Sequence, residues 1–371
     1  MRKKILFLIH DLGQGGAEKV LVNLVNNMDS EKYDITVMSL FGGGVNEKFL
    51  NKEIKYQVIF SKTFPGNSHL MKLYSPKRLH EFFIKEKYDI EISYLEGPCA
   101  RIISGCSNKN TKLVSWIHVE QHTKECAAGA FRSYKESENC YKKFNKTICV
   151  SEAVKDDFMS LYPNVSDVQV LYNVNETDKI LRLKDEPVED NVFKDGEIRL
   201  CGVGKIMTNK GFDKLARIHK RLRDEGYSVH SYVLGDGPDR EKIEKYLVEY
   251  GLEDSFTFLG YQTNPYKYVS KCDLFVCTSI SEGFSTAATE ALILGVPVLT
   301  TPVAGMKELI GEDNVCGIIA EQSEDSLCEN ITKLIDNIDV LKSYKKNAFM
   351  RGKDFSTKAT VQAVESMLKK I

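Results

Sequence analysis

The sequence predicts an α/β protein that is built from two domains, each with its own parallel sheet. Its 371 residues are enough for two domains of roughly 150 residues each. Short apolar strands alternate with amphipathic helices in two series along the chain, and a charged, proline-bearing segment at 184–197 separates the two series. Such alternation is typical of βαβ units, so we expect two Rossmann-like β/α/β domains that face each other across a cleft.

The first series gives the expected elements of the N-terminal domain. The predicted strands are Lys3–Ile9, Asp34–Leu40, Asp89–Tyr94, Lys112–Ile117 and Lys146–Val150, and the predicted helices are Ala17–Met28, Pro76–Lys87 and Ala153–Leu161. In the second series the predicted strands are Ile198–Val203, Val229–Leu234, Phe256–Leu259, Leu274–Thr278 and Val298–Thr300, and the predicted helices are Phe212–Glu225, Glu241–Tyr250 and Ala287–Leu294. We place the domains at 1–183 and 198–355, the linker at 184–197, and a C-terminal helix at 356–371 that could pack back on the first domain.

The composition narrows the class of protein. Lys plus Arg number 51 and Asp plus Glu number 52, so the net charge of −1 gives no sign of nucleic-acid binding. No apolar run approaches the roughly 18 residues that a bilayer span needs. The apolar run Ile5–Ile9 is followed by no small-residue cleavage site, and the ten cysteines form no Cys-x-x-Cys pair. We therefore expect a cytoplasmic protein with reduced thiols and no cysteine metal site.

The strongest chemical signal follows the predicted strand that ends near Thr278. Glu282 comes after this strand, Gly283 permits a tight turn, and Ser285 or Thr286 can cap the helix that starts there. The helix start offers free N–H groups to an anion, and Glu290 lies roughly two turns further along. Two carboxylates placed in this way could hold the two ends of an elongated polyol ligand. The alternative is a solvated helix with surface glutamates.

A second signal directly follows the strand Ile198–Val203. Gly202 and Gly204 allow close approach of a ligand to the backbone, and Lys205 and Lys210 add two cations with no acidic residue between them. A pair of ammonium groups after a glycine-rich strand end suits a diphosphate. The alternative is a lysine-rich surface loop.

A third stretch, residues 54–80, contains no acidic residue. Its cations alternate with aromatic residues: Lys55, Lys62, Lys72, Lys77 and Arg78 with Tyr56, Phe60, Phe64 and Tyr74. This pattern suits anionic lipid headgroups or a pyrophosphate-linked lipid acceptor, and it equally suits a solvated loop and helix face.

These motifs together resemble the retaining family 4 glycosyltransferases, which have the GT-B architecture. Glu282 and Glu290 match the family's Glu-x7-Glu element, and residues 202–211 match its Gly-x-Gly-[Arg/Lys]-x4-Lys-Gly element. Weaker matches lie at 13–18, 149–152, 234–238 and 258–260, so the resemblance covers nearly the whole chain. Two departures are Lys205, where the family more often has arginine, and residues 172–176, which shorten the family's usual hinge.

The resemblance implies a role for each motif. Lys205 and Lys210 would hold the donor diphosphate, Glu290 would bond the ribose hydroxyls, and Glu282 would bond the donor sugar together with the backbone of Gly283 and Phe284. His118, at the end of the strand Lys112–Ile117, would lie near the donor sugar. The predicted catalytic residues are thus His118, Lys205, Lys210 and Glu282. The other residues expected to bind the donor are Gly15, Gly16, Gly204, Tyr261, Ser285 and Thr286.

The resemblance also implies the reaction. We expect a hexosyltransferase that moves a sugar, with retention, from a nucleotide diphosphate sugar to a glycan or lipid-linked saccharide in cell-surface polysaccharide biosynthesis. A UDP-sugar is the preferred donor, and peripheral contact with the inner face of the plasma membrane would go through residues 54–80. We expect no cofactor and no metal ion, since no Asp-x-Asp motif occurs. His118 and His122 have the spacing of a metal-binding pair, but no third ligand is evident.

Other functions remain open at this stage. A GT-B relative could be a nucleotide-sugar epimerase or hydrolase, or a non-catalytic scaffold that binds another glycosyltransferase. A dinucleotide-binding enzyme is disfavoured because residues 13–16 do not complete a Gly-x-Gly-x-x-Gly motif. No P-loop motif occurs.

Overall fold

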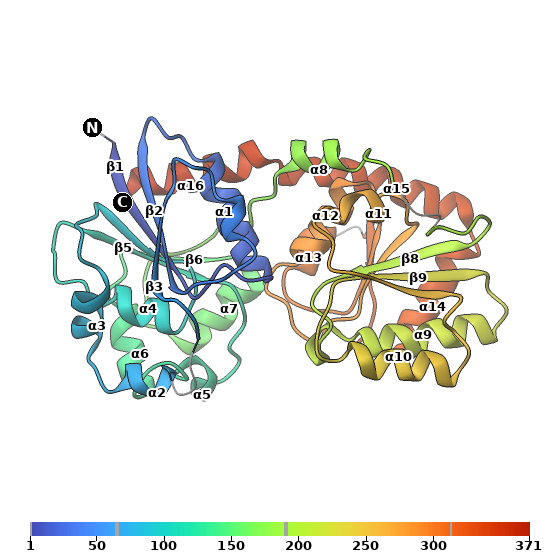
Figure 1. Cartoon of the computed structure of the whole chain (residues 1–371), viewed down its shortest axis with the longest axis horizontal. Coiled ribbons are helices and arrows are strands. Elements are labelled where there is room, and N and C mark those ends of the chain that lie inside the picture. Colours follow the sequence, from blue (N-terminus) through green and yellow to red (C-terminus); the bar gives the residue numbers. More distant parts are fainter. Residues whose placement is uncertain (1, 64–66, 189–191, 312–313) are drawn as a thin grey trace. The chain divides into compact units, whose positions relative to one another are not determined.

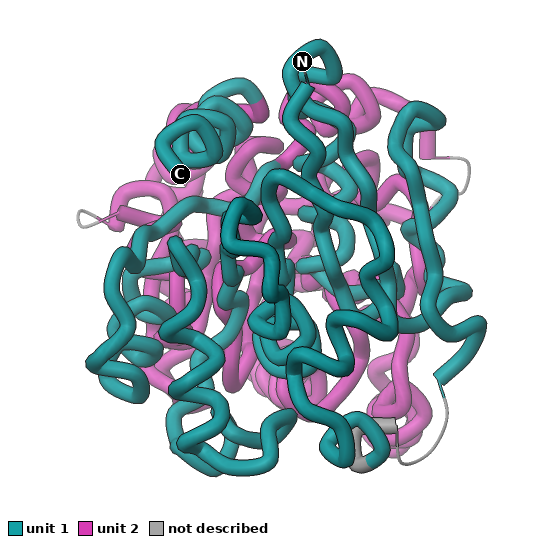
Figure 2. Tube along the Cα trace, turned by 90° about the vertical axis from the view of Figure 1, so that its left-hand side faces the viewer, with its two compact units in different colours: residues 1–174, 358–371 teal, residues 175–357 magenta. Residues whose placement is uncertain are grey.

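The computed structural model describes residues 2–63, 67–188, 192–311 and 314–371. The chain divides into two compact units, shown in different colours in Figure 2. Unit 1 comprises Met1–Val174 and Lys358–Ile371, and unit 2 comprises Asn175–Thr357. Each unit contains a parallel sheet with helices packed on it (Figure 1).

Unit 1 contains a seven-stranded sheet. Its strands are β1 (Lys3–Ile9), β2 (Tyr33–Phe41), β3 (Lys55–Phe60), β4 (Ile90–Ser93), β5 (Lys112–Ile117), β6 (Lys146–Cys149) and β7 (Val168–Val170). Its helices are α1 (Gly16–Asn27), η1 (Glu47–Phe49), α2 (Asn67–Lys72), α3 (Pro76–Phe83), α4 (Pro98–Ile103), α5 (Lys124–Ala127), α6 (Tyr134–Tyr141), α7 (Glu152–Leu161) and most of α16 (Thr357–Lys370).

The strand order in unit 1 is β3-β2-β1-β4-β5-β6-β7, and every pair is parallel. The strand β1 is central, with Ile5 opposite Ile35 on one side and Ile90 on the other. Its residues Ile5–Ile9 are fully buried, as expected for a strand covered on both faces by helices. The strand order reverses between β1 and β4, so a crevice is expected at the carboxyl ends of these two strands.

Unit 2 repeats this plan with a six-stranded sheet. Its strands are β8 (Ile198–Val203), β9 (Val229–Leu234), β10 (Phe256–Gly260), β11 (Leu274–Cys277), β12 (Val298–Thr300) and β13 (Gly317–Ile319). Its helices are α8 (Thr177–Leu183), η2 (Thr208–Lys210), α9 (Phe212–Asp224), α10 (Arg240–Glu249), α11 (Tyr266–Val269), α12 (Thr286–Ile293), α13 (Met306–Ile310), α14 (Glu324–Ile335), α15 (Ile338–Gly352) and η3 (Lys353–Phe355).

The strand order in unit 2 is β10-β9-β8-β11-β12-β13, again with parallel pairs. The core between this sheet and its helices includes Leu200, Leu215, Val233, Val276 and Leu299. The order reverses between β8 and β11. The carboxyl ends of these two strands carry the two strongest sequence motifs, so the fold brings the motifs to the same edge of one sheet.

The border between the units differs from the expected one at residue 183. The residues 175–183, which include helix α8, belong to unit 2 and not to the first domain, where they were expected. The reason is local, because the side chain of Asn264 donates a hydrogen bond to the carbonyl of Leu183 at 2.9 Å. Of the expected linker, residues 189–191 lie outside the described residues. Its later part packs on unit 2, where the ring of Phe193 contacts that of Tyr232.

The C-terminal helix α16 packs on unit 1. The ammonium group of Lys3 donates to the carbonyl of Leu368 at 3.2 Å, and Glu365 accepts the backbone N–H of Asp29 at 2.9 Å. Within the described residues, we find no helix that combines the length and the apolar character needed to cross a bilayer. All ten cysteines are free.

Candidate active site

The carboxyl end of β8 comes unusually close to the turn that follows β9. The N–H of Gly204 donates to the carbonyl of Leu234 at 2.9 Å. Gly235 lies opposite Gly204 with φ of 138°, and a Cβ atom there would clash with the Gly204 carbonyl. Glycine is therefore required at position 235 for the two segments to pack this closely.

A lysine and a glutamate from the two motifs form an ion pair at this edge. The Lys210 ammonium lies 2.6 Å from Oε1 of Glu282, and the Ser279 hydroxyl donates to the same oxygen at 2.7 Å. The side chains of Lys210 and Glu282 are 27% and 11% exposed, so the pair is held in place but accessible. The loops are tied together as well, since Thr278 donates to the carbonyl of Gly211 at 2.7 Å.

Lys205 adds a second positive charge beside this pair. It is exposed and makes no ion pair with any residue that the structure describes. A Cβ atom added to Gly204, its neighbour in the chain, would lie 3.9 Å from Cδ of Lys210. The Lys210 side chain therefore lies near Gly204, which precedes Lys205 in the chain.

The turn before α12 follows the predicted capping pattern. The Ser285 hydroxyl accepts the N–H of Ala288 at 3.3 Å and so caps the helix. The Phe284 ring is buried against that of Phe355, with 5.9 Å between centroids, so only the backbone of Phe284 is available to a ligand. A Cβ atom on Gly305 would lie 2.8 Å from the Gly283 carbonyl, which shows how closely the next loop supports this turn.

Glu290 lies on α12 and is buried. The hydroxyl of Tyr266, a buried residue of α11, donates to its Oε1 at 3.2 Å. A buried carboxylate held by a tyrosine is a fixed acceptor for hydroxyl groups. Thr286 is half-buried at the start of α12, and Tyr261 is exposed just beyond β10.

In unit 1 the corresponding edge carries a buried histidine and a glutamate. The imidazole of His118 lies beside the ring of Tyr94, with 5.0 Å between centroids, and its Nε2 has no hydrogen-bond partner among the described residues. The backbone N–H of His118 donates to Oε2 of Glu96 at 3.0 Å. Burial lowers the pKa of His118 to about 3 and raises the pKa of Glu96. His118 is therefore neutral at physiological pH, and its Nε2 is a buried polar atom without a partner among the described residues.

The glycine turn after β1 is lined by carboxylates. Gly15 is the N-cap of α1, and a Cβ atom there would clash with the carboxylate of Glu18. Gly16 is the first residue of the helix. The N–H of Gly13 donates to Oδ1 of Asp11 at 2.7 Å. Burial raises the pKa of Glu18, and the neighbouring charge of Asp11 adds to the effect.

The second histidine of the His118–His122 spacing does not complete a metal site. His122 is exposed, and its Nδ1 lies 3.8 Å from Oδ1 of Asp157. Within the described residues, neither histidine belongs to a group of three potential metal ligands.

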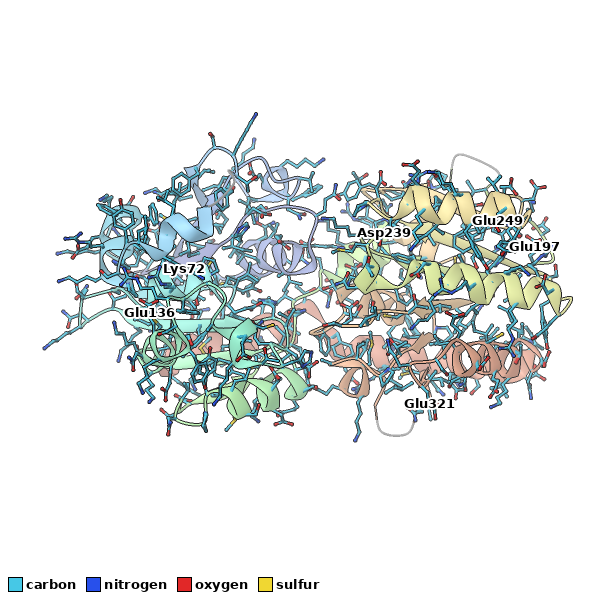
Figure 3. The ribbon with its side chains drawn as sticks, turned by 90° about the horizontal axis from the view of Figure 1, so that it is seen from below. Lys72, Glu136, Glu197, Asp239, Glu249 and Glu321 are labelled. Carbon is cyan, nitrogen blue, oxygen red and sulfur yellow. The ribbon has the colours of Figure 1, made fainter. Side chains whose placement is uncertain are left out.

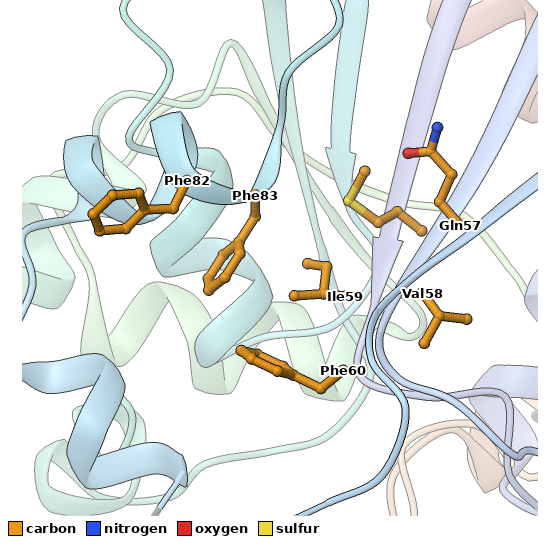
Figure 4. Close-up of a pocket in the computed structure, with 7 residues that line it drawn as sticks. Gln57, Val58, Ile59, Phe60, Phe82 and Phe83 are labelled. Carbon is orange, nitrogen blue, oxygen red and sulfur yellow. The ribbon is translucent and has the colours of Figure 1, made fainter.

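The residues 54–80 form strand β3, helix α2 and the start of α3, while Phe64 lies outside the described residues. A pocket of about 340 Å³ lies in unit 1 between this strand and α3 (Figure 4). It is lined by Met38, Gln57, Val58, Ile59, Phe60, Phe82 and Phe83. Since β3 is the edge strand of the sheet, this pocket lies away from the β1–β4 crevice.

Two arginines fix the segment that follows α2. Arg101 is buried, pairs with Glu136 at 3.0 Å and donates to the carbonyl of Tyr74 at 2.7 Å. Arg132 donates to the carbonyl of Leu73 at 2.8 Å, and its own N–H is accepted by Glu136. Arg132 also donates to the carbonyl of Lys72 at 2.6 Å, and Figure 3 labels Lys72 and Glu136. The exposed side chains of this segment are therefore presented by an ordered backbone.

Three residues near the carboxyl edges of the two sheets were not predicted from the sequence. They are Asp11, just after β1, Glu96, just after β4, and Tyr266, on the short helix α11. No repeated spacing along the sequence identifies them. The one available signal for Glu96 was its position just after the strand Asp89–Tyr94, in the same sheet as His118.

Taken together, two Rossmann-like units and a cationic, glycine-rich strand end define a protein of the GT-B class. Two family models cover most of the chain: residues 14–179 match Glycosyltransferase Family 4, and residues 184–351 match Glycosyl transferases group 1. The chain belongs to the glycosyltransferases.

Its relatives agree with this assignment. The chain is 25% identical over 376 residues, covering 95% of this chain and 96% of the other, to the N-acetylgalactosamine-N,N'-diacetylbacillosaminyl-diphospho-undecaprenol 4-alpha-N-acetylgalactosaminyltransferase of Campylobacter jejuni. It is 26% identical to the lipopolysaccharide 1,6-galactosyltransferase of Salmonella typhimurium, covering 80% of each chain. The structure of Anabaena HepE in complex with UDP and glucose superposes with a TM-score of 0.79 at 18% identity, covering 100% of both chains.

Proposed function

We propose that this glycosyltransferase transfers a hexose-type sugar, with retention, from a UDP-sugar to a glycan or lipid-linked saccharide during the synthesis of a cell-surface polysaccharide. Unit 2 binds the donor and unit 1 binds the acceptor. The observation that carries the proposal is the set of two lysines and two glutamates at the carboxyl edge of β8 and β11.

The donor chemistry follows from the charges of this set. The diphosphate accepts hydrogen bonds from Lys205 and Lys210 and from free N–H groups at the start of α12. Lys210 keeps its bond to Glu282, because an ammonium group has three donors. Negative charge builds up on the diphosphate as the sugar–oxygen bond breaks, and fixed cations stabilise that charge.

The two glutamates then bind hydroxyl groups. Glu290, oriented by Tyr266, accepts from the ribose, and Glu282, with the backbone of Gly283 and Phe284, accepts from the sugar. The pairing of Lys210 with Glu282 holds the diphosphate and the sugar next to each other. UDP as the nucleotide of the donor is supported by the ligands named for the structural relatives HepE and TarM.

The acceptor is the less defined substrate. Relatives are named for lipid-linked saccharides, lipopolysaccharide and poly(ribitol-phosphate). In unit 1, the neutral imidazole of His118 offers a hydrogen bond to a sugar hydroxyl. No step in this scheme requires a divalent ion, so we expect transfer to continue in the presence of a chelator.

A surface of unit 1 suits contact with a membrane that carries the acceptor. Leu73 and Phe82 are 72% and 52% exposed, and Leu70 and Tyr74 are exposed beside them. Lys77 and Arg78 at the start of α3 are exposed as well. Apolar side chains among cations favour an interface with anionic lipids.

Vesicles with anionic lipid should bind the protein. Leu73→Asp should weaken this binding several-fold, while Val248→Asp, at an exposed site on α10, should not.

The experiment that tests the donor proposal is a thermal-shift panel. UDP, GDP, ADP and their sugars are added to the full-length protein, and we expect the largest rise in Tm with UDP or a UDP-sugar. Release of UDP is then followed with and without saccharide acceptors. An acceptor-dependent release supports transfer. A rise with GDP or ADP alone would contradict the choice of base.

The same assay separates the alternative functions. Product formed from a UDP-sugar without any acceptor would indicate a hydrolase or an epimerase. An absence of any nucleotide-induced shift would indicate a scaffold and would contradict the proposal.

A further inference from the structure

Three side chains from separate segments of unit 1 meet outside the candidate active site. His80 stands on α3, Glu91 stands on β4, and Cys106 lies just beyond α4. The Nε2 atom of His80 lies 2.7 Å from Oε2 of Glu91, and the sulfur of Cys106 lies 3.8 Å from the other carboxylate oxygen. The three ligand atoms all lie within 4.8 Å of one another.

The burial of this cluster is unusual for a charged group. The side chain of Glu91 is 3% exposed in the middle of a parallel sheet, next to β1 and β5, and that of His80 is 12% exposed. Burying a carboxylate is costly unless its charge is compensated, which here requires either a protonated His80 or a bound cation in place of that proton. Cys106 is only half-buried, so an ion from solvent can reach the sulfur first.

The donor atoms match the preference of one class of ion. Imidazole nitrogen, thiolate sulfur and carboxylate oxygen are the ligands of zinc, whereas magnesium and calcium prefer oxygen alone. Zinc–ligand bonds of about 2.0–2.3 Å in a tetrahedron place ligand atoms about 3.4 Å apart. The distance between Nε2 of His80 and Oε2 of Glu91 is 2.7 Å, and that between the sulfur of Cys106 and Oε1 of Glu91 is 3.8 Å, so the two distances lie on both sides of this value. Small side-chain rotations would therefore close the site around an ion.

The cluster is also separate from the groups assigned to the transfer reaction. Glu91 stands near the start of β4, and α4 runs back along the sheet before it reaches Cys106. Glu96 and His118, by contrast, follow the carboxyl ends of β4 and β5. An ion held by the cluster would therefore link α3 to the sheet without touching the reacting groups.

We propose that His80, Glu91 and Cys106 form a binding site for a zinc-class divalent ion, with solvent as the fourth ligand. The site joins α3, β4 and the end of α4. It stabilises the part of unit 1 that carries the exposed residues of α3. It is independent of the proposed transfer reaction, which needs no metal ion.

The test uses the full-length protein after treatment with a chelator and removal of the chelator. Zn²⁺ is titrated by calorimetry, and we expect one tight equivalent per chain and a rise in Tm. Cys106→Ser should weaken binding by at least 100-fold. Cys126→Ser, at an exposed cysteine on α5, should leave binding unchanged, and so should His122→Gln, whereas His80→Gln should weaken it.

Co²⁺ gives a readout that does not depend on the folding of a variant. Cobalt bound to the wild-type chain should show a thiolate-to-metal charge-transfer band and the visible bands of a tetrahedral site. Binding that is absent, that survives Cys106→Ser, that is lost in Cys126→Ser, or that lacks the thiolate band would overturn the proposal. Donor binding by UDP is measured separately, so failure of this site would leave the proposed function intact.

Discussion

The turns that follow the first strands of the two sheets occupy equivalent places but carry opposite charges. Each turn follows a central strand, β1 or β8, at the point where the strand order reverses. In unit 1 the turn is lined by Asp11 and Glu18. In unit 2 it carries Lys205 and Lys210. The same βα geometry is therefore combined with different electrostatics.

This difference suggests how one fold can serve two substrates. A glycine turn before a helix offers close backbone approach in both units, but only a cationic turn compensates a diphosphate. The carboxylates of unit 1 are better suited to neutral hydroxyl groups. Burial raises the pKa of Glu18, and this lessens the negative charge of the turn in unit 1.

The largest expected effect comes from removing the cation at the centre of unit 2. Lys210→Ala should lower kcat by about 10²–10³-fold, the usual scale for one electrostatic donor in a transition state. It should also weaken UDP binding. Lys242→Ala, an exposed lysine on α10, is the matched control. Normal turnover by Lys210→Ala, measured as UDP release, would contradict the donor assignment.

A smaller effect is expected at the ribose end of the donor site. Glu290→Gln replaces a charged acceptor by a neutral one and should weaken UDP binding by about 10–100-fold, as expected for a hydrogen bond to a charged group. Calorimetry with UDP measures this change. Glu249→Gln on the surface of α10 should bind UDP normally. An equal loss of UDP affinity in both variants would argue against a specific contact between Glu290 and the ribose.

The histidine of unit 1 should affect the reaction without affecting donor affinity. His118→Gln removes one neutral hydrogen bond and should lower kcat by about tenfold, while the Kd for UDP remains unchanged. His122→Gln should behave like the wild type. A loss of UDP affinity in His118→Gln would show that donor and acceptor roles do not divide between the units as proposed.

The smallest effect concerns a buried histidine of unit 2 that has a structural role. His219 is fully buried between the hydroxyls of Ser231 and Ser255, each 2.9 Å away. Burial lowers its pKa to about 3, below the value of about 6.5 in the unfolded chain. The unfolded chain therefore binds a proton between these values that the folded chain does not bind.

Because of this difference, the stability that neutral His219 contributes is present above about pH 6.5 and is lost as pH falls. At pH 5.5 the loss should be about 1 kcal/mol. Urea unfolding between pH 7.5 and 5.5 measures how the free energy of unfolding changes with pH. His219→Gln should reduce this pH dependence without changing the affinity for UDP. A free energy of unfolding that rises as pH falls over this range would contradict the lowered pKa of His219.

The sequence predicted the central strands well and the edges less well. The bounds of β1, β5, β8, β9 and β12 agree with the predicted ones, because these buried parallel strands are rich in apolar residues. The edge strand β3 was not predicted as a strand, since Lys55–Phe60 mixes polar and apolar residues at a half-solvated edge. The helix from Pro76 ends at Phe83 instead of Lys87.

The same contrast applies to the candidate site. Residues within one motif, such as Glu282 and Glu290, are found by spacing along the chain. The ion pair of Lys210 with Glu282 depends on two strands that meet only in the folded sheet. The cluster of His80, Glu91 and Cys106 is harder still to predict, because its members come from two helices and a strand with no common spacing.

We propose that the cationic edge of unit 2 holds the donor diphosphate. A crystal structure of the full-length protein with UDP tests it most directly. We predict that the diphosphate lies within hydrogen-bond distance of the ammonium groups of Lys205 and Lys210, with the ribose hydroxyls on Glu290. A diphosphate bound only at the acidic turn of unit 1, or away from both lysines, would contradict the account.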